Sequence, residues 1–280
     1  MTNSTALDLA KKTKCRVIAI ANQKGGVAKT TTTVNLGIGL ARKGQRVLLI
    51  DADAQGSLTT SLGFKDQDSM DYTLATVLRK IKARKPYDPN EGILFHNEGV
   101  FLMPGNIETA DLESGLIEAM RREYIMKQYI ESLRDQFDWI LIDCMPSLGI
   151  VTTNSLVAAD SVLIPVQTGY LPAKGLYQLM DTIIDLIECK VNPDLYVEGI
   201  LLTMLDERTN YTKNIVQQIK EGYGNDAYIF KSQIPMSVRV AECSGLGMSI
   251  YQHDGKYKAA SAYEAFVQEV IDNAKNGGVS

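Results

Sequence analysis

Short apolar runs alternate with longer amphipathic segments along most of this chain. Six runs have apolar residues on both faces, as parallel strands do when helices cover them from both sides; the expected strands are 15–21, 46–50, 100–103, 138–142, 161–166 and 197–204. Apolar residues recur at helical spacing around 30–43, 107–135, 148–158, 172–189, 209–221 and 258–274. This alternation predicts an α/β fold with a doubly wound, mostly parallel sheet, in which ligands bind beyond the carboxyl ends of the strands.

The pattern predicts a single domain over residues 15–275, because no Pro-, Gly- or Ser-rich linker divides it. Residues 1–14 form a polar leader without the apolar core of a signal peptide, and 276–280 form a flexible tail. The polar segment 64–99 fits the alternation least well and is a possible insertion. Its basic stretch RKIKARK, at 79–85, is typical of a solvated helix face.

Composition narrows the class of protein. Of the 280 residues, 45% are hydrophobic and 22% are charged, and no apolar run approaches the roughly 18 residues that cross a bilayer. The four cysteines show no CxxC spacing, which favours free thiols in a reducing, cytoplasmic compartment over a zinc or iron–sulfur site. A formal net charge of −4 is unlike the basic footprint of most nucleic-acid binders.

A glycine-rich loop stands between the first expected strand and the first expected helix. It consists of Lys24, Gly25, Gly26, Val27, Ala28, Lys29, Thr30 and Thr31. The strict phosphate-loop pattern G-x-x-x-x-G-K-[ST] is not met, because Gln23 and Ala28 occupy its two glycine positions. The loop instead has the form K-G-G-x-x-K-[ST], with two lysines and two adjacent glycines.

The chemistry of this loop still fits a nucleotide phosphate chain. Gly25 and Gly26 can adopt positive φ and bring backbone N–H groups close to phosphate oxygens, next to the positive end of a helix. Lys29 can reach the β- and γ-phosphates, and the Thr30 hydroxyl can bind Mg²⁺. We expect Ala28 to be tolerated because a position that enters a helix has negative φ.

Acidic residues follow two of the expected strands. Asp51 and Asp53 leave the carboxyl edge of the strand 46–50, where both would face the phosphates and could orient water or help to hold a metal. Asp143 ends the apolar run 138–142, in the manner of a Walker-B aspartate that binds Mg²⁺ directly or through water.

Taken together, these segments resemble the ParA/Soj branch of the deviant Walker-A ATPases, a group that includes MinD and the nitrogenase iron protein. The resemblance rests on ANQKGGVAKTTTTVNL (21–36), RVLLIDADAQGS (46–57), DWILIDCMPSLG (138–149), IPVQTGY (164–170) and EGILLTMLDERTN (198–210). It implies a P-loop NTPase-like fold with a deviant Walker-A loop, ATP and Mg²⁺ as cofactors, and a homodimer that sandwiches two ATP molecules.

The resemblance also assigns roles to single residues. It implies that Lys24 reaches the partner's nucleotide, that Lys29 binds the phosphates in cis, and that Asp53 orients the hydrolytic water. The metal would be held at Thr30 and Asp143, with Asp51 nearby.

Two outer surfaces follow from the same resemblance. The stretch that begins at Ile234 is similar to the family's loop over the adenine, which implies base contacts by Pro235 and Ser237. Met236 departs from the family, which often has an arginine there. Nonspecific DNA binding is implied for the basic residues Arg208, Arg239, Lys256 and Lys258.

The implied function is that of a DNA-partition ATPase. It would dimerise on ATP, bind double-stranded DNA without sequence preference, and be reset by weak hydrolysis that a ParB-like centromere-binding protein stimulates. Because the DNA contacts would be to phosphates, a few cations suffice, and the net charge of −4 limits the affinity rather than excluding DNA.

Two alternatives stay open: a MinD/FlhG-like spatial regulator, and a nucleotide-switched binding protein with negligible hydrolysis. A MinD-like protein needs a basic amphipathic helix at its C-terminus. The segment SAYEAFVQEVIDNAKNGGVS (261–280) carries more acidic than basic residues, so we expect no membrane partner and a nucleoid-associated protein of the cytoplasm.

Overall fold

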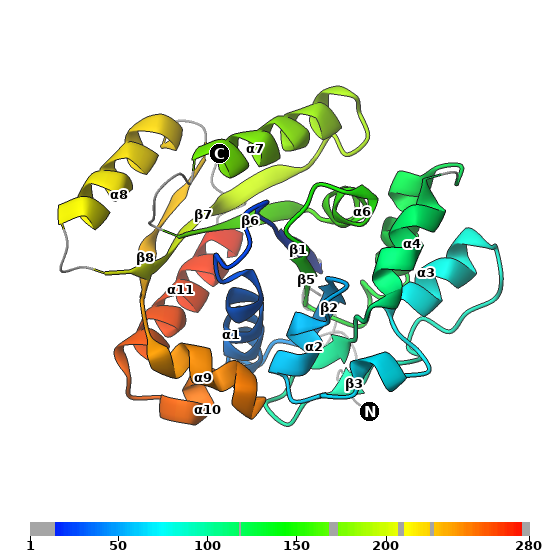
Figure 1. The fold of residues 1–280 in the computed structure, drawn as a ribbon, viewed down its shortest axis with the longest axis horizontal. Helices are drawn as coiled ribbons and strands as arrows, with labels where there is room; N and C mark the ends of the chain where they lie inside the picture. The colour runs from blue at the N-terminus through cyan, green and yellow to red at the C-terminus, as the bar shows by residue number, and fades with distance from the viewer. Residues whose placement is uncertain (1–14, 118, 168–172, 207–209, 225–226, 276–280) are drawn as a thin grey trace, which may run out of the picture.

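Eight strands form one sheet in the computed structural model, which describes residues 15–117, 119–167, 173–206, 210–224 and 227–275 (Figure 1). Their order across the sheet is β3-β4-β2-β5-β1-β6-β7-β8, and neighbouring strands are parallel except for β3 and β4. The strands are β1 (Arg16–Ile20), β2 (Val47–Ala52), β3 (Leu94–Phe95), β4 (Phe101–Met103), β5 (Trp139–Cys144), β6 (Ser161–Gln167), β7 (Tyr196–Leu205) and β8 (Ile229–Pro235). The predicted α/β class with a mostly parallel sheet is confirmed.

Eleven α-helices within the described ranges connect and cover these strands. They are α1 (Lys29–Arg42), α2 (Ser57–Ser61), α3 (Leu74–Lys82), α4 (Glu108–Leu116), α5 (Ile125–Glu131), α6 (Ile150–Ala158), α7 (Ala173–Glu188), α8 (Asn210–Tyr223), α9 (Val238–Leu246), α10 (Ile250–Asp254) and α11 (Lys258–Lys275). Two 3₁₀ turns, η1 (Gln67–Ser69) and η2 (Arg122–Tyr124), complete the regular structure.

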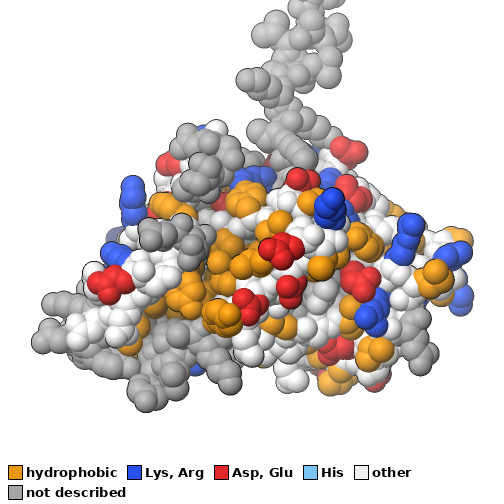
Figure 2. All heavy atoms as spheres, turned by 90° about the horizontal axis from the view of Figure 1, so that it is seen from above, with side chains coloured by type: hydrophobic (Ala, Val, Ile, Leu, Met, Phe, Trp, Pro, Cys, Tyr) orange, Lys and Arg blue, Asp and Glu red, His pale blue; other side chains and the backbone are white. Residues whose placement is uncertain are grey.

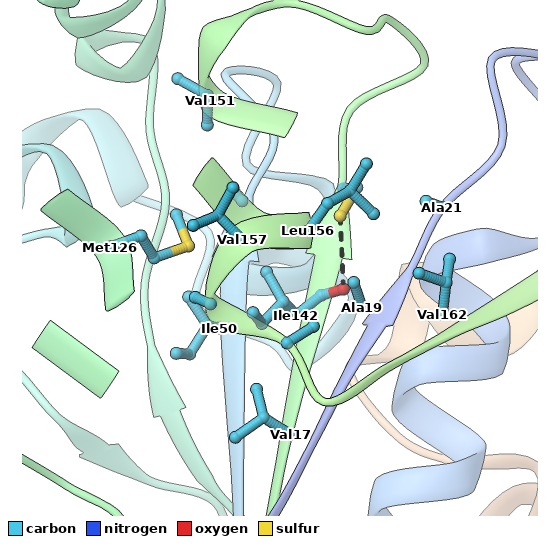
Figure 3. Packing of buried hydrophobic residues seen from close by; sticks show 14 of the residues in the cluster. Val17, Ala19, Ala21, Ile50, Met126, Ile142, Val151, Leu156, Val157 and Val162 are labelled. Carbon is cyan, nitrogen blue, oxygen red and sulfur yellow. Dashed lines mark hydrogen bonds between the residues drawn. The ribbon is translucent and has the colours of Figure 1, made fainter. Parts of the chain in front are cut away.

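The sheet separates two hydrophobic cores, because successive residues of a strand point to opposite faces. In β1, Val17 and Ala19 face the core that α3 to α8 cover, whereas Ile18 and Ile20 face the core under α1, α2 and α9 to α11. Figure 3 shows the first core at close range, where α6 packs Val157 over the central strands. Burial on both faces explains why the central strands are continuous apolar runs.

The predicted helical segment 107–135 is wrong as a single element. The structure divides it into α4 and α5, with the turn η2 between them. Arg121, directly before η2, has a left-handed φ of 53°, which no α-helix accommodates. Asn154 of α6 fixes the start of α5, because its amide donates to the carbonyl of Arg122 at 2.7 Å and accepts from the N–H of Met126 at 3.1 Å.

Strand β8 has no counterpart among the strands expected from apolar patterning. Its polar residues Lys231, Ser232 and Gln233 interrupt the apolar run, and only Phe230 and Ile234 are buried. The strand lies at the edge of the sheet, where one side needs no apolar cover. Glu269 of α11 holds it by accepting hydrogen bonds from the N–H groups of Lys231 and Ser232, at 2.8 and 3.0 Å.

The polar segment 64–99 contributes to the main core although its sequence suggests an insertion. It forms α3 and the edge strand β3, and its buried residues are Leu74, Ala75, Val77, Leu78 and Ile81. On the outer side of α3, Arg79 pairs with Glu108 and Lys80 with Glu91, so the first cations of the basic stretch lie on a solvated face as expected.

We expect Leu78→Ala to lower the free energy of unfolding by about 2–5 kcal/mol, because it would leave a cavity under a fully buried side chain. Urea unfolding followed by circular dichroism measures the change. Lys85→Ala, at an exposed position of the same segment, is the control and should change stability by less than about 0.5 kcal/mol. Equal effects of the two substitutions would show that α3 is peripheral to the core.

Candidate active site at the carboxyl edge of the sheet

The glycine-rich loop joins β1 to α1 at the centre of the carboxyl edge. Gly26 has a left-handed φ of 72°, whereas Gly25 does not adopt positive φ. A Cβ atom built on either glycine would meet no other atom within 4 Å, so the space over this part of the loop is open. The loop therefore exposes its backbone to a ligand at the two positions where the sequence predicted it.

Ala28 corrects one expectation. Its φ is +67°, in the left-handed region, and not negative as predicted for a residue that enters a helix. Ala28 is the N-cap of α1, and its apolar side chain caps none of the free N–H groups of the first helical turn. Those N–H groups and the helix dipole therefore remain available to an anion.

Lys29 begins α1 and points back under the loop. Only 7% of its surface is exposed, and its Nζ donates to the carbonyl oxygen of Lys24 at 3.2 Å. Burial lowers the pKa of Lys29, while the nearby carboxyl group of Asp143 opposes the shift. The lysine is thus a poorly solvated cation that a phosphate chain would stabilise.

Asp143, the last acidic residue of β5, lies against the first turn of α1. Its Oδ2 accepts a hydrogen bond from the Thr30 hydroxyl at 2.7 Å, and its Oδ1 accepts one from the Thr33 hydroxyl at 3.3 Å. Burial, followed by the neighbouring Asp51, raises the pKa of Asp143 to about 8. The strand and the helix thus bring together the hydroxyl and the carboxylate that the sequence predicted as metal ligands.

Asp51 is buried next to Asp143 but bonds in another direction. The two residues are register partners in β2 and β5. The Oδ2 of Asp51 accepts from the N–H of Thr59 at 2.8 Å and from its hydroxyl at 2.7 Å, so the carboxylate holds α2. Burial raises the pKa of Asp51 to about 6. Gly105 crosses directly over this group, and a Cβ there would lie 2.4 Å from the Asp51 carbonyl oxygen.

Asp53 lies in the loop between β2 and α2. Its N–H donates to Oδ1 of Asp51 at 3.3 Å, and its own Oδ1 accepts from the N–H of Gln55 at 3.0 Å. Asp53 is partly exposed, unlike Asp51. The pair predicted at this edge is therefore divided into one buried and one accessible carboxylate.

Three further residues fix the loop and had no recognised signal in the sequence. Buried Asn22 accepts from the N–H of Lys24 at 2.9 Å and donates to the carbonyl of Pro165 in β6 at 2.8 Å. Thr203 of β7 donates to the carbonyl of Val27 at 3.1 Å. Thr33 might have been found from the run of four threonines after Lys29, since it lies one helical turn beyond Thr30.

The expected base-contacting residues follow directly from β8. Pro235 is the last residue of that strand, and Ser237 is the N-cap of α9, where its hydroxyl accepts from the N–H of Val240 at 3.3 Å. Met236 between them is 61% exposed. Both residues therefore stay candidates for base contacts.

The structure brings three of the four expected DNA-contacting residues to one corner. Arg239 of α9 stacks on the ring of Tyr257 at 4.8 Å, which places it beside Lys256 and Lys258. Arg239 also forms an ion pair with Asp254, and its side chain is half exposed. Arg208 lies outside the described residues.

The site fits Mg²⁺ better than a metal held by the protein alone. In the described part of the chain, no group of three or more His, Cys, Asp or Glu side chains could hold a metal ion. Mg²⁺ is commonly bound through one or two carboxylates together with substrate phosphates and water, and Thr30 and Asp143 offer that partial set. Cys144 is buried beside Asp143, and burial raises its thiol pKa to about 12, which disfavours thiolate ligation.

No α-helix in the described ranges combines the length and the apolar character needed to cross a bilayer.

Comparisons with known proteins agree with this site. A family model described as an AAA domain matches residues 15–197. The chain is 40% identical to the sporulation initiation inhibitor protein Soj of Bacillus subtilis, covering 92% of this chain and 99% of Soj. It is also 40% identical to the chromosome partitioning protein ParA of Myxococcus xanthus, covering 91% and 88% of the two chains.

A solved structure is similar over the same range. It is described as cobyrinic acid a,c-diamide synthase from Mycobacterium smegmatis with bound ATP analogue and magnesium. The TM-score is 0.82 at 36% identity, and the match covers 94% of this chain and 97% of that one.

The left-handed N-cap predicts the effect of Ala28→Gly. Left-handed backbone costs a non-glycine residue roughly 1–2 kcal/mol, and glycine loses about 0.5–1 kcal/mol more entropy on folding. We therefore expect Ala28→Gly to stabilise the protein by up to about 1 kcal/mol in thermal unfolding. Ala41→Gly, within right-handed α1, is the control and should destabilise it by about 1 kcal/mol. Destabilisation by both substitutions would contradict strain at Ala28.

The raised pKa of Asp143 predicts a pH dependence of stability. Between the ordinary value of 3.8 and about 8, the folded state keeps a proton that the unfolded state releases, so the free energy of unfolding should fall as pH rises through this window. Asp143→Asn should remove most of the decrease above pH 6, where Asp51 has already ionised. Urea unfolding across the window tests this, with exposed Asp71→Asn as control. Parallel curves for the wild type and Asp143→Asn would refute the assignment.

Proposed function

The chain belongs to the Soj/ParA family of partition ATPases, and from that premise we propose that it binds ATP and Mg²⁺, dimerises on ATP and then binds double-stranded DNA without sequence preference. Slow hydrolysis, stimulated by a ParB-like centromere-binding partner, would reset the cycle. The observation that carries the proposal is the contact between Thr30 and Asp143 below an open glycine loop.

This contact supports ATP and Mg²⁺ because it joins the two parts of a phosphate site. The hydroxyl of Thr30 and the carboxylate of Asp143 would hold the metal, while Lys29 and the first-turn N–H groups of α1 would bind the phosphates. When bound, Mg²⁺ would neutralise charge on the phosphate oxygens. The relative from M. smegmatis was solved with an ATP analogue and magnesium, and it has the same fold at 36% identity.

Dimerisation and hydrolysis would use the partly exposed groups of the loop region. Lys24 has its N–H and carbonyl fixed by Asn22 and Lys29, so its side chain leaves from an anchored backbone toward the open side. A cation placed there would stabilise charge that develops on a transferred phosphoryl group. Asp53 is the accessible carboxylate of its pair and would orient the attacking water.

The DNA surface would form at the corner of Arg239, Lys256 and Lys258. Arg239 is half exposed and lies beside the two lysines through its contact with Tyr257. Asp254 offsets part of this charge, so the affinity should be modest and strongly dependent on salt. The nucleoid location in the cytoplasm belongs to the same proposal.

A filter-retention assay on random duplex DNA tests the proposal at low salt with ATP, with ADP and without nucleotide. We expect retention with ATP alone, and at least about tenfold weaker retention for Arg239→Glu, which reverses a phosphate-facing charge. Lys65→Glu, at an exposed lysine outside this corner, is the matched control and should bind like the wild type. Absence of ATP-dependent retention would reject the partition function and leave a spatial regulator as the alternative.

Sedimentation and phosphate release test the nucleotide cycle separately. Asp53→Ala should form a lasting dimer with ATP and release little phosphate, because it keeps the phosphate site and loses the group that orients water. Lys29→Ala should lose nucleotide binding. Unchanged turnover in Asp53→Ala would contradict its role, and negligible turnover in the wild type, even with a cognate partner, would favour a nucleotide-switched binding protein.

A further inference from the structure

Helix α7 has a wider apolar face than the sheet beneath it covers. Its buried side is formed by Leu176, Leu179, Ile183 and Leu186. A second apolar stripe follows one residue later along the helix and consists of Tyr177, Met180, Ile184 and Ile187. Tyr177 is 60% exposed and Ile184 is 46% exposed. Residues spaced by three and four lie on one side of a helix, so this stripe is continuous.

Helix α8 supplies the opposite wall. Its apolar side consists of Ile215, Val216, Ile219 and Tyr223, of which only Ile219 is buried. Tyr223 lies close enough to Tyr177 for the two phenol groups to interact electrostatically, so the apolar sides of α7 and α8 face each other. Seen from above, hydrophobic side chains form a band on the face that these two helices cover (Figure 2). We call the band formed by both apolar sides the α7–α8 groove.

Acidic residues line the α7 side of this groove. Asp181, Asp185 and Glu188 are exposed and follow the apolar stripe around the helix. Among the described residues, none of these three side chains forms an ion pair or a hydrogen bond. Acidic side chains also lie next to the hydrophobic band in Figure 2.

We propose that the α7–α8 groove binds an amphipathic helix of a partner protein, with its apolar side on Tyr177 and Ile184 and with Lys or Arg residues against the acidic row of α7. A helix of this kind places apolar anchors at the same spacing as the stripe on α7. Its basic residues would pair with three carboxylates that have no partner within the described chain, which fixes orientation and speeds association.

The charge of the rim argues against other occupants. DNA and anionic lipid both present phosphates, which the acidic row would repel. A symmetric dimer through this groove would bring the acidic row of one copy close to the same row of the other. A basic helix is the occupant for which both the apolar stripe and the charges are favourable. This inference goes beyond the proposed function, which assigns no residue of this chain to a protein partner.

Fluorescence anisotropy with a designed probe tests the proposal. The probe is a fluorescein-labelled peptide of about 18 residues, long enough to form a helix, with Leu at i, i+3, i+7 and i+10 and Lys on the flanking positions. The full chain should bind it, and Asp181→Lys/Asp185→Lys should bind at least about tenfold more weakly. The control Asp71→Lys/Asp111→Lys reverses two exposed acids elsewhere and should bind within about twofold of wild type.

Further arms separate the apolar contact from general charge attraction. Ile184→Ser should weaken binding of the probe while its salt dependence is unchanged, because no charge is altered. A peptide of the same composition in scrambled order should bind far more weakly than the probe. The proposal fails if both charge-reversed variants bind alike, or if the scrambled peptide binds as well as the probe. Self-association of the chain that Ile184→Ser abolishes would also overturn it, by assigning the groove to a second copy.

Discussion

The contact between Thr30 and Asp143 ties the first helix to the centre of the sheet and creates the site at the same time. A carboxylate in a fully buried position is costly unless it is protonated, hydrogen-bonded or next to a cation. Here the hydroxyls of Thr30 and Thr33 donate to both oxygens, and the Lys29 ammonium lies nearby. The pKa of Asp143 is nevertheless raised and that of Lys29 lowered, so each group lacks part of its stabilisation. A metal ion at one group and a phosphate at the other would supply what both lack.

Asp51 extends this constraint to the other side of the sheet edge. By accepting two hydrogen bonds from Thr59 it fixes α2, which follows the Asp53 loop directly. Helix α2 in turn touches the end of α9, where a Cβ on Gly247 would lie 2.6 Å from the Cα of Gly63. The helix that carries Arg239 is therefore joined to the phosphate site through one short helix and one close backbone contact.

The sequence contained the parts of the site whose chemistry is local. The loop 24–31 and Asp143 could be found because a glycine-rich turn and an acid at the end of an apolar strand are visible in the order of residues. The left-handed Ala28 could not, since its side chain gives no reason for positive φ and the loop is held from outside by Asn22 and Thr203. Such contacts join residues far apart in the chain.

The same reasoning separates success from failure in the fold. The central strands were found because both of their faces are covered, whereas β8 was missed because its edge position allows polar residues such as Lys231. The break between α4 and α5 depends on Asn154 of a later helix, so no pattern within 107–135 reveals it. Sequence patterns predict an element well when its burial is uniform, and poorly when a distant side chain decides where it ends.

The uneven distribution of charge gives the net value of −4 its meaning. Basic side chains meet at the corner of α9 and α11, although Asp254 neutralises part of their charge. The row of acids on α7 lies over a different part of the sheet, well separated from that corner in Figure 1. Because the two regions have opposite signs, they would select ligands of opposite charge, and neither ligand would compete for the surface of the other. A phosphate polymer at one corner and a basic helix on α7 could then be bound by the same chain at the same time.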